Sequence, residues 1–377
     1  MAQRLTEART PFTILARDGK ARRASLRTAH GTVQTPAFMP VGTHATVKAC
    51  HPQEVAQTGA EMLLSNFYHL SLRPGMELIA ELGGLHRFMG WSGSILTDSG
   101  GYQLVSLGEL IDLDDSGVTF RSPYDGATIQ LTPQGVVEGQ LRLGSDVIMA
   151  LDHPVPYGTS TEQAATATNR THLWARQCRQ IDTGESLLFG IIQGGFEVGP
   201  RAESAQVIAG LGFDGVALGG LVLGEPPQVR QLAIAACVEN LPELLPRYVM
   251  GLGTDLDLLD SVARGIDLFD CVLPTRLART GTVLTDHGRL SLRQARFRGD
   301  GNRLEESCEC PACTGFSRAY LRHLYVSGEI LAHRLLSLHN LWHLGRLMAE
   351  ARAAIERGQL QGLIEARRLE LSQGVVS

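Results

Sequence analysis

Lysine is nearly absent from this chain of 377 residues, because Lys20 and Lys48 are its only lysines. Arginine supplies the rest of its 34 basic residues, and 39 acidic residues leave a formal net charge of −5. That charge excludes a surface that attracts nucleic acid over its whole area. The arginines are unevenly spread, however: seven lie between Arg276 and Arg303, against two aspartates. Forked guanidinium donors suit phosphate, although genomic base composition is an alternative cause of the arginine excess.

Long apolar runs are also missing. No stretch approaches the length that spans a bilayer, and residues 1–10 lack the apolar core of a secretory leader. The seven cysteines are an odd count, and four stand singly, which makes a disulfide framework a poor fit: Cys50, Cys178, Cys237 and Cys271. These absences predict a cytoplasmic protein that works in a reducing compartment. Apolar residues make up 44% of the chain, enough for a large core.

Short apolar runs recur along the chain after two turns, Asp18–Gly19 and His30–Gly31, that predict an N-terminal hairpin region. Eight runs of strand type follow: Thr35–Met39, Glu61–Ser65, Ser94–Thr97, Asp146–Leu151, Leu187–Ile192, Gly215–Leu218, Tyr248–Met250 and Ile266–Phe269. Helix-like segments lie between most of them: Thr132–Leu143, Thr161–Gln180, Gly199–Leu211, Pro226–Leu241 and Asp255–Arg264. This alternation is typical of parallel strands covered by helices. Eight strands favour a closed (β/α)8 barrel, with a doubly wound sheet as the alternative.

Polar residues or glycines end most of these runs: Asn66, Asp98, Asp152, Gln193, Gly219–Gly220, Gly251 and Asp270. For any single strand, a polar residue where the loop begins is ordinary. In a barrel, however, the carboxyl ends of all strands share one face, where the loops build the active site. The whole set therefore predicts a site at that face.

The segment Gly265–Thr280 carries the clearest chemical signal. Asp267 and Asp270 interrupt an apolar run, a Leu-Pro pair ends it, and two arginines follow. An acid at the end of a buried strand, beside guanidinium groups, suits a nucleophile next to a phosphate-bearing substrate. A charged surface loop is the alternative. Because the two aspartates are three positions apart, at most one of them points to the barrel mouth.

Three cysteines stand close together as C-x-C-x2-C: Cys308, Cys310 and Cys313. His339 follows on an expected helix, Gly328–Leu341. Three thiolates and one imidazole fill the tetrahedral shell of a closed structural zinc site. His323, His333 and His343 are alternatives for the fourth ligand. Such a site has no open coordination position, so we expect one zinc ion to hold a small subdomain together.

Motifs from nearly the whole chain occur in one order: TPAFMPVGT, NFYHLSLRPG, GGLHRFMGW, LTDSGGYQ, SPYDG, GSDVIMALD, GIIQGG, FDGVALGG, MGLGT, GIDLFDCVLPTR and the cysteine–histidine array. In these the chain resembles the bacterial-type queuine/tRNA-guanine transglycosylases. The resemblance implies a (β/α)8 TIM barrel with an inserted zinc-binding subdomain near the C-terminus, in a cytoplasmic homodimer. We expect a β-hairpin region capping the barrel at 1–35, the barrel at 36–299, the zinc-binding subdomain at 300–340 and C-terminal helices at 341–377.

The resemblance also implies a reaction. It exchanges the wobble guanine of tRNAs with GUN anticodons (Tyr, His, Asn, Asp) for 7-aminomethyl-7-deazaguanine, in queuosine biosynthesis and without an energy cofactor. Replacing a base while keeping the β linkage takes two displacements, as in retaining glycosidases. The family pattern gives Asp270 as the nucleophile of a covalent aspartyl-ribosyl intermediate, and Asp98 as the general acid/base.

The remaining family positions contact the substrates. Asp152 would accept hydrogen bonds from the base, and Gln193 and the Gly220 N–H would donate to it, while Tyr102 and Met250 would sandwich its ring. The resemblance implies further substrate contacts from four residues: Ser99, the carbonyl of Leu221, Glu225 and Asn66. It places two arginines, Arg276 and Arg279, on the anticodon loop.

Two departures from the family pattern affect the pocket for the 7-substituent. His153-Pro154-Val155-Pro156 replaces the usual Glu-Cys-Thr-Pro, and Leu223 replaces a small β-branched residue. The bulk of Leu223 argues against a pocket for whole queuine, so a queuine-inserting variant is an alternative. Two rivals differ in class. A non-catalytic tRNA-binding subunit should have lost one of the acids, and a carbohydrate-active barrel would not need the arginine-rich stretch.

Overall fold

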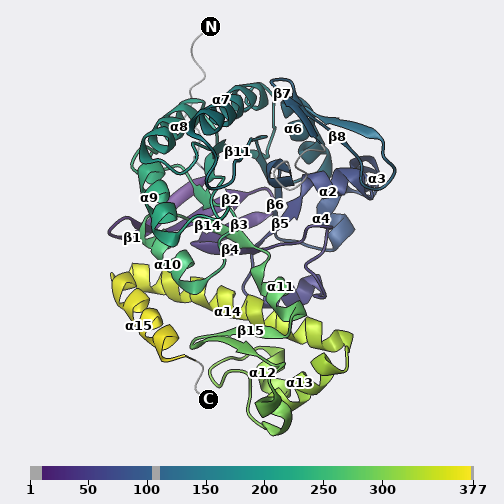
Figure 1. Ribbon diagram of the computed structural model, residues 1–377, viewed down its shortest axis with the longest axis vertical. Helices are drawn as coiled ribbons and strands as arrows, with labels where there is room; N and C mark the ends of the chain where they lie inside the picture. The colour runs from purple at the N-terminus through teal and green to yellow at the C-terminus, as the bar shows by residue number, and fades with distance from the viewer. Residues whose placement is uncertain (1–10, 104–110, 375–377) are drawn as a thin grey trace.

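The computed structural model describes residues 11–103 and 111–374, and it shows a ring of parallel strands surrounded by helices (Figure 1). The eight strands of this sheet are β4 (Ala37–Pro40), β5 (Met62–Asn66), β6 (Ser94–Asp98), β10 (Val147–Met149), β11 (Leu187–Ile192), β12 (Gly215–Leu218), β13 (Arg247–Val249) and β14 (Leu268–Cys271). They pair in the order β4-β14-β13-β12-β11-β10-β6-β5. A parallel bridge between Val41 and Leu64 joins the two ends. The expected eight-stranded barrel is confirmed, and the doubly wound alternative is wrong.

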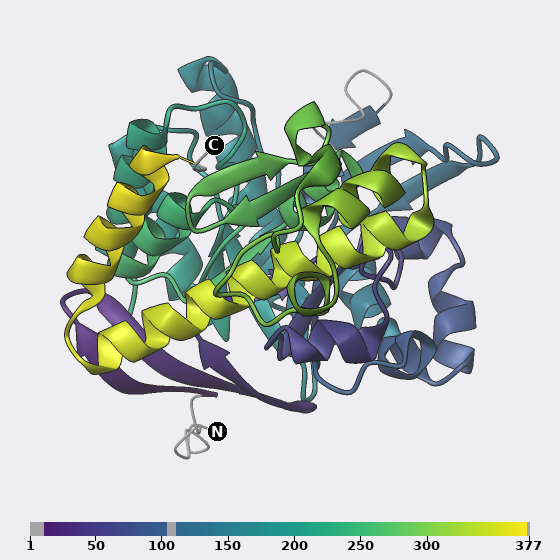
Figure 2. The same cartoon turned by 90° about the horizontal axis from the view of Figure 1, so that it is seen from below.

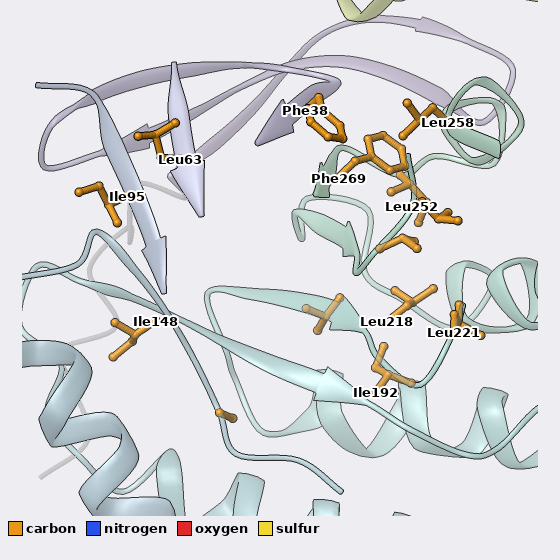
Figure 3. Packing of buried hydrophobic residues seen from close by; sticks show 14 of the residues in the cluster. Phe38, Leu63, Ile95, Ile148, Ile192, Leu218, Leu221, Leu252, Leu258 and Phe269 are labelled. Atoms are coloured by element: carbon orange, nitrogen blue, oxygen red, sulfur yellow. The ribbon is translucent and has the colours of Figure 1, made fainter. Parts of the chain in front are cut away.

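Helices cover the outside of the ring: α1 (Pro52–Gln57), α2 (Phe67–Leu72), α3 (Met76–Glu81), α4 (Gly84–Met89), α6 (Pro133–Leu143), α7 (Thr161–Cys178), α8 (Val198–Gly210), α9 (Pro227–Val238), α10 (Asp255–Ala263) and α11 (Leu273–Arg279). Local chemistry sets their ends. In α6, the Thr132 side chain accepts from Gly135 N at 3.0 Å, Pro133 takes the first position, and Gly144 ends the helix with φ +74°. Figure 3 shows buried side chains of strands and neighbouring loops and helices in the core cluster that holds the helices to the barrel, among them Phe38, Leu63, Ile148 and Phe269.

A second sheet closes the amino end of the barrel. It is antiparallel and consists of β1 (Phe12–Asp18), β2 (Ala21–Thr28) and β3 (Gly31–Thr35). Its buried side chains share one cluster with the barrel interior, where Phe12, Leu26 and Val33 join Met149 and Phe189. Side chains of the N-terminal sheet therefore fill the amino end of the barrel, and its carboxyl end is left for a site. A further antiparallel sheet, which the sequence analysis did not anticipate, lies between β6 and α6: β7 (Ile111–Asp114), β8 (Gly117–Arg121) and β9 (Thr128–Leu131).

The C-terminal part lies beside the barrel and is crossed by one long helix (Figures 1 and 2). Its elements are β15 (Thr282–Thr285), β16 (Gly288–Ser291), the 3₁₀ helix η2 (Ala295–Gly299), α12 (Pro311–Gly315), α13 (Arg318–Val326), α14 (Ile330–Glu356) and α15 (Leu360–Gln373). The helix expected to end at Leu341 continues for 15 residues more, to Glu356, because its apolar side chains beyond Leu341 are buried in the main core cluster. Gly345 lies within this helix, at a point where α14 packs closely against the carbonyl of Thr58. A Cβ at this position would collide with that carbonyl, so only glycine permits the close packing.

The expected division at residue 340 thus falls inside α14. The division of the chain into four regions stays a prediction, and the outer ends of the first and last regions lie outside the described residues. Among the helices of the described ranges, none is both long and apolar enough to cross a membrane.

Candidate active site

Side chains from successive strand ends form a connected chain of contacts around the barrel mouth. Asn66 and Asp98 are paired neighbours at the ends of β5 and β6, and Asn66 Nδ2 donates to Asp98 Oδ2 at 2.8 Å. The loop after Asp98 presses against Asp152, because a Cβ on Gly101 would collide with the Asp152 carboxylate. Gln193 Nε2 then donates to Asp152 Oδ2 at 2.6 Å. These contacts bring residues from four strand ends to one side of the site.

The opposite side of the mouth is built around Asp270. Its Oδ1 accepts from the hydroxyl of Tyr248 at 2.6 Å and from the backbone N of Gly251 at 2.8 Å. Burial raises the pKa of this carboxyl, and the two donors oppose that shift by stabilising the charged form. Burial also raises the pKa of Tyr248 well above 10, so its hydroxyl remains a donor. Two hydrogen bonds to one oxygen fix the orientation of the carboxylate.

Asp98 lies in an environment that favours its protonated form. Burial, followed by the charge of Asp270, raises the pKa of Asp98 to about 8, and the Asn66 hydrogen bond only partly opposes this. Its Oδ1 is buried and has no hydrogen-bond partner within the described residues. The charge of Asp270 therefore reaches Asp98 across the mouth, and the raised pKa keeps the proton on Asp98 near neutral pH. Burial raises the pKa of both carboxyls, but only the pKa of Asp98 is raised further by the charge of its partner. Asp270 therefore loses its proton before Asp98, and this order suits acid/base chemistry.

Asp267 is engaged at the other end of the barrel. It is fully buried and forms an ion pair with Arg22 of β2, whose Nε donates to Asp267 Oδ1 at 3.1 Å. Its Oδ2 also accepts from Arg247 N at 2.7 Å. Asp267 thus fastens the N-terminal sheet to the barrel, and it does not face the mouth.

Asp152 and Gln193 lie against the loop after β12, because a Cβ on Gly219 would contact both side chains. Burial raises the pKa of Asp152 to about 6, while the hydrogen bond from Gln193 opposes the shift. Gln193 is buried and touches the α-carbon region of Gly220, which has φ +67°. A side chain at Gly220 would be strained by this φ and would collide with Gln193. The N–H of Gly220 makes no hydrogen bond in the described chain, so it is available to a ligand.

Glu225 fixes the turn that follows. Its two oxygens accept from Val222 N at 2.8 Å and from Leu223 N at 2.9 Å, and Arg230 donates to it at 2.9 Å. Val222 has φ +65°, an unusual conformation for a β-branched residue. Because the carbonyl and N–H of a trans peptide point in opposite directions, the carbonyl of Leu221 faces away from Glu225.

The other expected site residues are placed as follows. Tyr102 is 59% exposed, and Met250 is partly buried at the end of β13. Ser99 is buried directly after Asp98. Arg276 and Arg279 are exposed and three positions apart on α11, so they lie on one face of that helix.

The Cys3His cluster is assembled and buried. His339 Nδ1 lies 3.7 Å from the sulfur of Cys308, 3.4 Å from that of Cys310 and 3.3 Å from that of Cys313. These separations match the edges of a zinc tetrahedron with metal–ligand bonds of roughly 2.0–2.3 Å. His339 Nε2 lies 2.8 Å from the carbonyl of Leu284, which leaves Nδ1 free to ligate. The cluster could hold a metal ion and fits zinc.

Two further residues shape the site without a signal in the sequence. The hydrophobic pattern indicates only that Tyr248 belongs to a strand and that Arg201 belongs to a helix. In the structure, Tyr248 donates to Asp270, and Arg201 binds the carbonyls of the loops that follow β11 and β12. Alternation within the strand could have placed Tyr248 inside the barrel, but not beside an acid of the next strand.

A (β/α)8 barrel with paired acids at its carboxyl end and a Cys3His cluster that could hold a metal ion defines a class of barrel enzymes. The family model described as queuine tRNA-ribosyltransferase matches residues 18–373. A queuine tRNA-ribosyltransferase of Pelotomaculum thermopropionicum is 51% identical over 352 residues, which cover 93% of this chain and 95% of that one. One of Sorangium cellulosum is 49% identical over 363 residues, 95% and 92% of the two chains. The chain therefore belongs to the queuine tRNA-ribosyltransferase family, a family of transferases.

Proposed function

We propose that this protein is a tRNA-guanine transglycosylase. It exchanges the wobble guanine of tRNAs with GUN anticodons (Tyr, His, Asn, Asp) for 7-aminomethyl-7-deazaguanine, as a step of queuosine biosynthesis. The observation that carries the proposal is the pair Asp98 and Asp270, which come from distant parts of the chain, end two strands of one barrel, and lie near enough for the charge of Asp270 to raise the pKa of Asp98. Family membership supports the substrate class, because the relatives are named as tRNA ribosyltransferases acting with queuine.

The first displacement uses both acids. Ionised Asp270 attacks the anomeric carbon of the ribose, the bond from that carbon to guanine breaks, and the electron pair leaves with the base. Asp98, which holds a proton near neutral pH because its pKa is raised to about 8, gives that proton to the departing guanine. The product is a covalent aspartyl-ribosyl tRNA and free guanine.

The second displacement reverses these roles. Asp98, now a carboxylate, removes the proton from the ring nitrogen of the incoming base, and that nitrogen attacks the anomeric carbon. The ester bond to Asp270 breaks and its carboxylate is restored. Two inversions return the original β configuration, as in retaining glycosidases. Asn66, which donates to Asp98, positions this acid on the ribose side.

Base recognition uses the pocket at the ends of β10, β11 and β12. Asp152, whose pKa of about 6 leaves it ionised at neutral pH, accepts from N1–H and the exocyclic amine. Gln193 and the N–H of Gly220 donate to the O6 and N7 side. The remaining contacts come from Ser99, and from Tyr102 and Met250 as the two walls that stack on the ring.

The incoming base is proposed from the turn at Leu221–Glu225. The Leu221 carbonyl, turned away from Glu225, accepts from the aminomethyl group. Leu223 restricts the volume next to it, and its own carbonyl accepts from Tyr157 N at 3.2 Å, which ties the two loops together. The limited volume beside Leu223 favours the aminomethyl base over whole queuine. A competition between guanine, the aminomethyl base and queuine on one tRNA tests the choice, and preferred incorporation of queuine would contradict it.

We also propose tRNA, one zinc ion and a second copy of the chain as the partners and cofactor of this protein. Arg276 and Arg279 on α11 contact the anticodon loop, and the arginine-rich stretch that continues to Arg303 binds phosphates. One zinc ion in the Cys3His cluster supplies structural support without an open coordination position. A cytoplasmic homodimer is proposed on the family resemblance alone.

Release of labelled guanine from tRNA tests the function. The wild-type protein should release guanine and incorporate free guanine, whereas Asp270→Asn should do neither. Asp182→Asn is the matched control, because Asp182 is an exposed aspartate in the loop before β11, at the opposite end of the barrel. A wild-type protein that binds tRNA but exchanges no guanine would instead support the non-catalytic subunit.

A further inference from the structure

The least expected group near the site is a buried cation. Arg201 lies in the first turns of α8 and is 0% exposed. Its guanidinium donates to the carbonyls of Gly195 at 2.6 Å, Gly219 at 2.8 Å and Ile192 at 3.2 Å. Within the described residues it forms no ion pair. Burying a charge without a carboxylate partner is costly, and such a cost points to a role beyond packing.

The link from this cation to the base pocket is one peptide unit. Arg201 binds the carbonyl of Gly219, and the N–H of the same peptide belongs to Gly220. Because the two groups of a trans peptide point in opposite directions, this hydrogen bond turns the Gly220 N–H away from the guanidinium. The Nη2 of Arg201, buried and without a partner in the described chain, lies 3.3 Å from the position of a Cβ on Gly220. The positive charge therefore sits directly behind the donor.

We propose that Arg201 is a positioning residue that strengthens the Gly220 N–H as a hydrogen-bond donor to O6 of the purine base. The proposal rests on the proposed function, which places O6 at this N–H. A cation on the carbonyl of a peptide withdraws electron density from its N–H, and hydrogen bonds in such a chain reinforce each other. Negative charge develops on the purine as its bond to ribose breaks, and a fixed positive field behind the donor stabilises it without reorganisation.

Two bases separate this role from a purely structural one. Guanine carries O6 and N1–H, whereas 2-aminopurine keeps the exocyclic amine but has neither, so each base is compared only with itself between the wild type and the variant. Binding of 2-aminopurine is measured by its fluorescence, and binding of guanine is measured by competition with it. In Arg201→Met, which removes the charge and keeps the bulk, guanine should bind about ten-fold more weakly, the change expected when a charge-assisted hydrogen bond becomes a neutral one. Binding of 2-aminopurine should change by less than about two-fold, since no donor to O6 is involved.

The controls keep the outcomes distinct. Arg352→Met removes a half-buried arginine that also donates to a carbonyl, that of Pro36 at 2.8 Å, at the amino end of the barrel. It should leave both affinities unchanged. Arg201→Lys keeps the charge and should restore part of the preference for guanine. If Arg201→Met does not fold, Arg201→Lys tests the proposal by itself. Its single ammonium cannot reach all three carbonyls, so the affinity for guanine should fall while the affinity for 2-aminopurine stays the same.

Equal weakening of both bases in the Arg201 variants would show that Arg201 only supports the loops, and it would overturn the inference while leaving the proposed function intact. A wild-type protein that binds neither base would instead overturn the proposed function, and the inference with it.

Discussion

At the scale of single residues, the proposed first displacement depends on a proton held by Asp98. Burial and the neighbouring Asp270 raise the pKa of Asp98 to about 8, far above the 3.8 of a free aspartate. The protonated form is then the major one below pH 8 and becomes scarce above it. Asp98 is thus suited to act first as an acid and then, once it has lost its proton, as a base.

A pH profile tests this directly. The rate of guanine release in a single turnover should be highest near pH 7, between the pKa of Asp152 at about 6 and that of Asp98 at about 8. Well above pH 8 it should fall about ten-fold for each further pH unit, because only protonated Asp98 can donate. Asp98→Asn should be slower by about 10²–10⁴-fold and should lack this fall. Tyr248 does not cause it, since its pKa lies well above 10. An Asp98→Asn variant that keeps the same decline above pH 8 would assign the acid to another group.

Residue roles were predictable from the sequence only where a strand end or a motif marked them. The acids and the amides at the strand ends fell into this class, because the carboxyl ends of barrel strands share a face. Tyr248 and Arg201 did not. The contact of Tyr248 with Asp270 depends on the pairing of β13 with β14, and the contact of Arg201 with Gly219 depends on the loop that follows the next strand, β12. Such pairings are not local in the sequence.

At the scale of elements, α14 connects the metal cluster to the proposed tRNA surface. His339 is one member of the cluster, and Asn340 beside it donates to the carbonyl of Pro274 in α11 at 2.9 Å. The Oδ1 of Asn340 also accepts from Leu284 N at 2.8 Å. The same turn of α14 therefore holds the cluster, β15 and the helix that carries Arg276.

Loss of the metal should consequently affect tRNA more than the base. Purified protein should contain one zinc ion per chain, and Cys310→Ser should lose it and unfold at a lower temperature. We expect a raised KM for tRNA with little change in guanine affinity, because the base pocket lies on the other side of the barrel mouth. Elemental analysis, thermal melts and steady-state kinetics check this. A zinc-free variant that keeps the wild-type KM for tRNA would break the proposed connection.

The close approach of α14 to the barrel gives a second prediction at this scale. Gly345→Ala should lower the free energy of unfolding by about 1–3 kcal/mol, because the new methyl group overlaps the carbonyl of Thr58. Helix propensity alone predicts the opposite sign, by about 1 kcal/mol.

Gly362→Ala in α15 is the matched control. A Cβ at Gly362 meets nothing within 4 Å, so propensity should dominate and the variant should be as stable as the wild type or more so. Denaturant titrations of both variants check the pair. A stabilised Gly345→Ala would mean that α14 does not pack so closely.

The strands and helices of the barrel were predictable because the hydrophobic pattern alternates between buried strands and amphipathic helices over the whole ring. Two elements were not. The β7-β8-β9 sheet has short strands with many polar residues, and α14 extends past Leu341 because it is buried along its length by the barrel and the zinc-binding part together. In both cases tertiary packing, which a local pattern does not contain, determines the element.

At the scale of the whole molecule, the fold separates support from chemistry. The amino end of the barrel is filled by the N-terminal sheet and fastened by the ion pair of Arg22 with Asp267. The carboxyl end carries the acids, the base pocket and the exposed arginines of α11. This polarity explains why two aspartates only three positions apart serve different purposes: Asp267 fastens the N-terminal sheet to the barrel, and Asp270 faces the mouth.

The central claim is that Asp270 carries the ribose of the tRNA between the two displacements. Mass spectrometry of peptides from protein that was quenched with tRNA under denaturing conditions, after removal of the free base, measures this most directly. We expect a nucleotide-bearing peptide that contains Asp270 in the wild type, and no adduct in Asp270→Asn. A tRNA adduct on any other residue, or one that persists in Asp270→Asn, would contradict it.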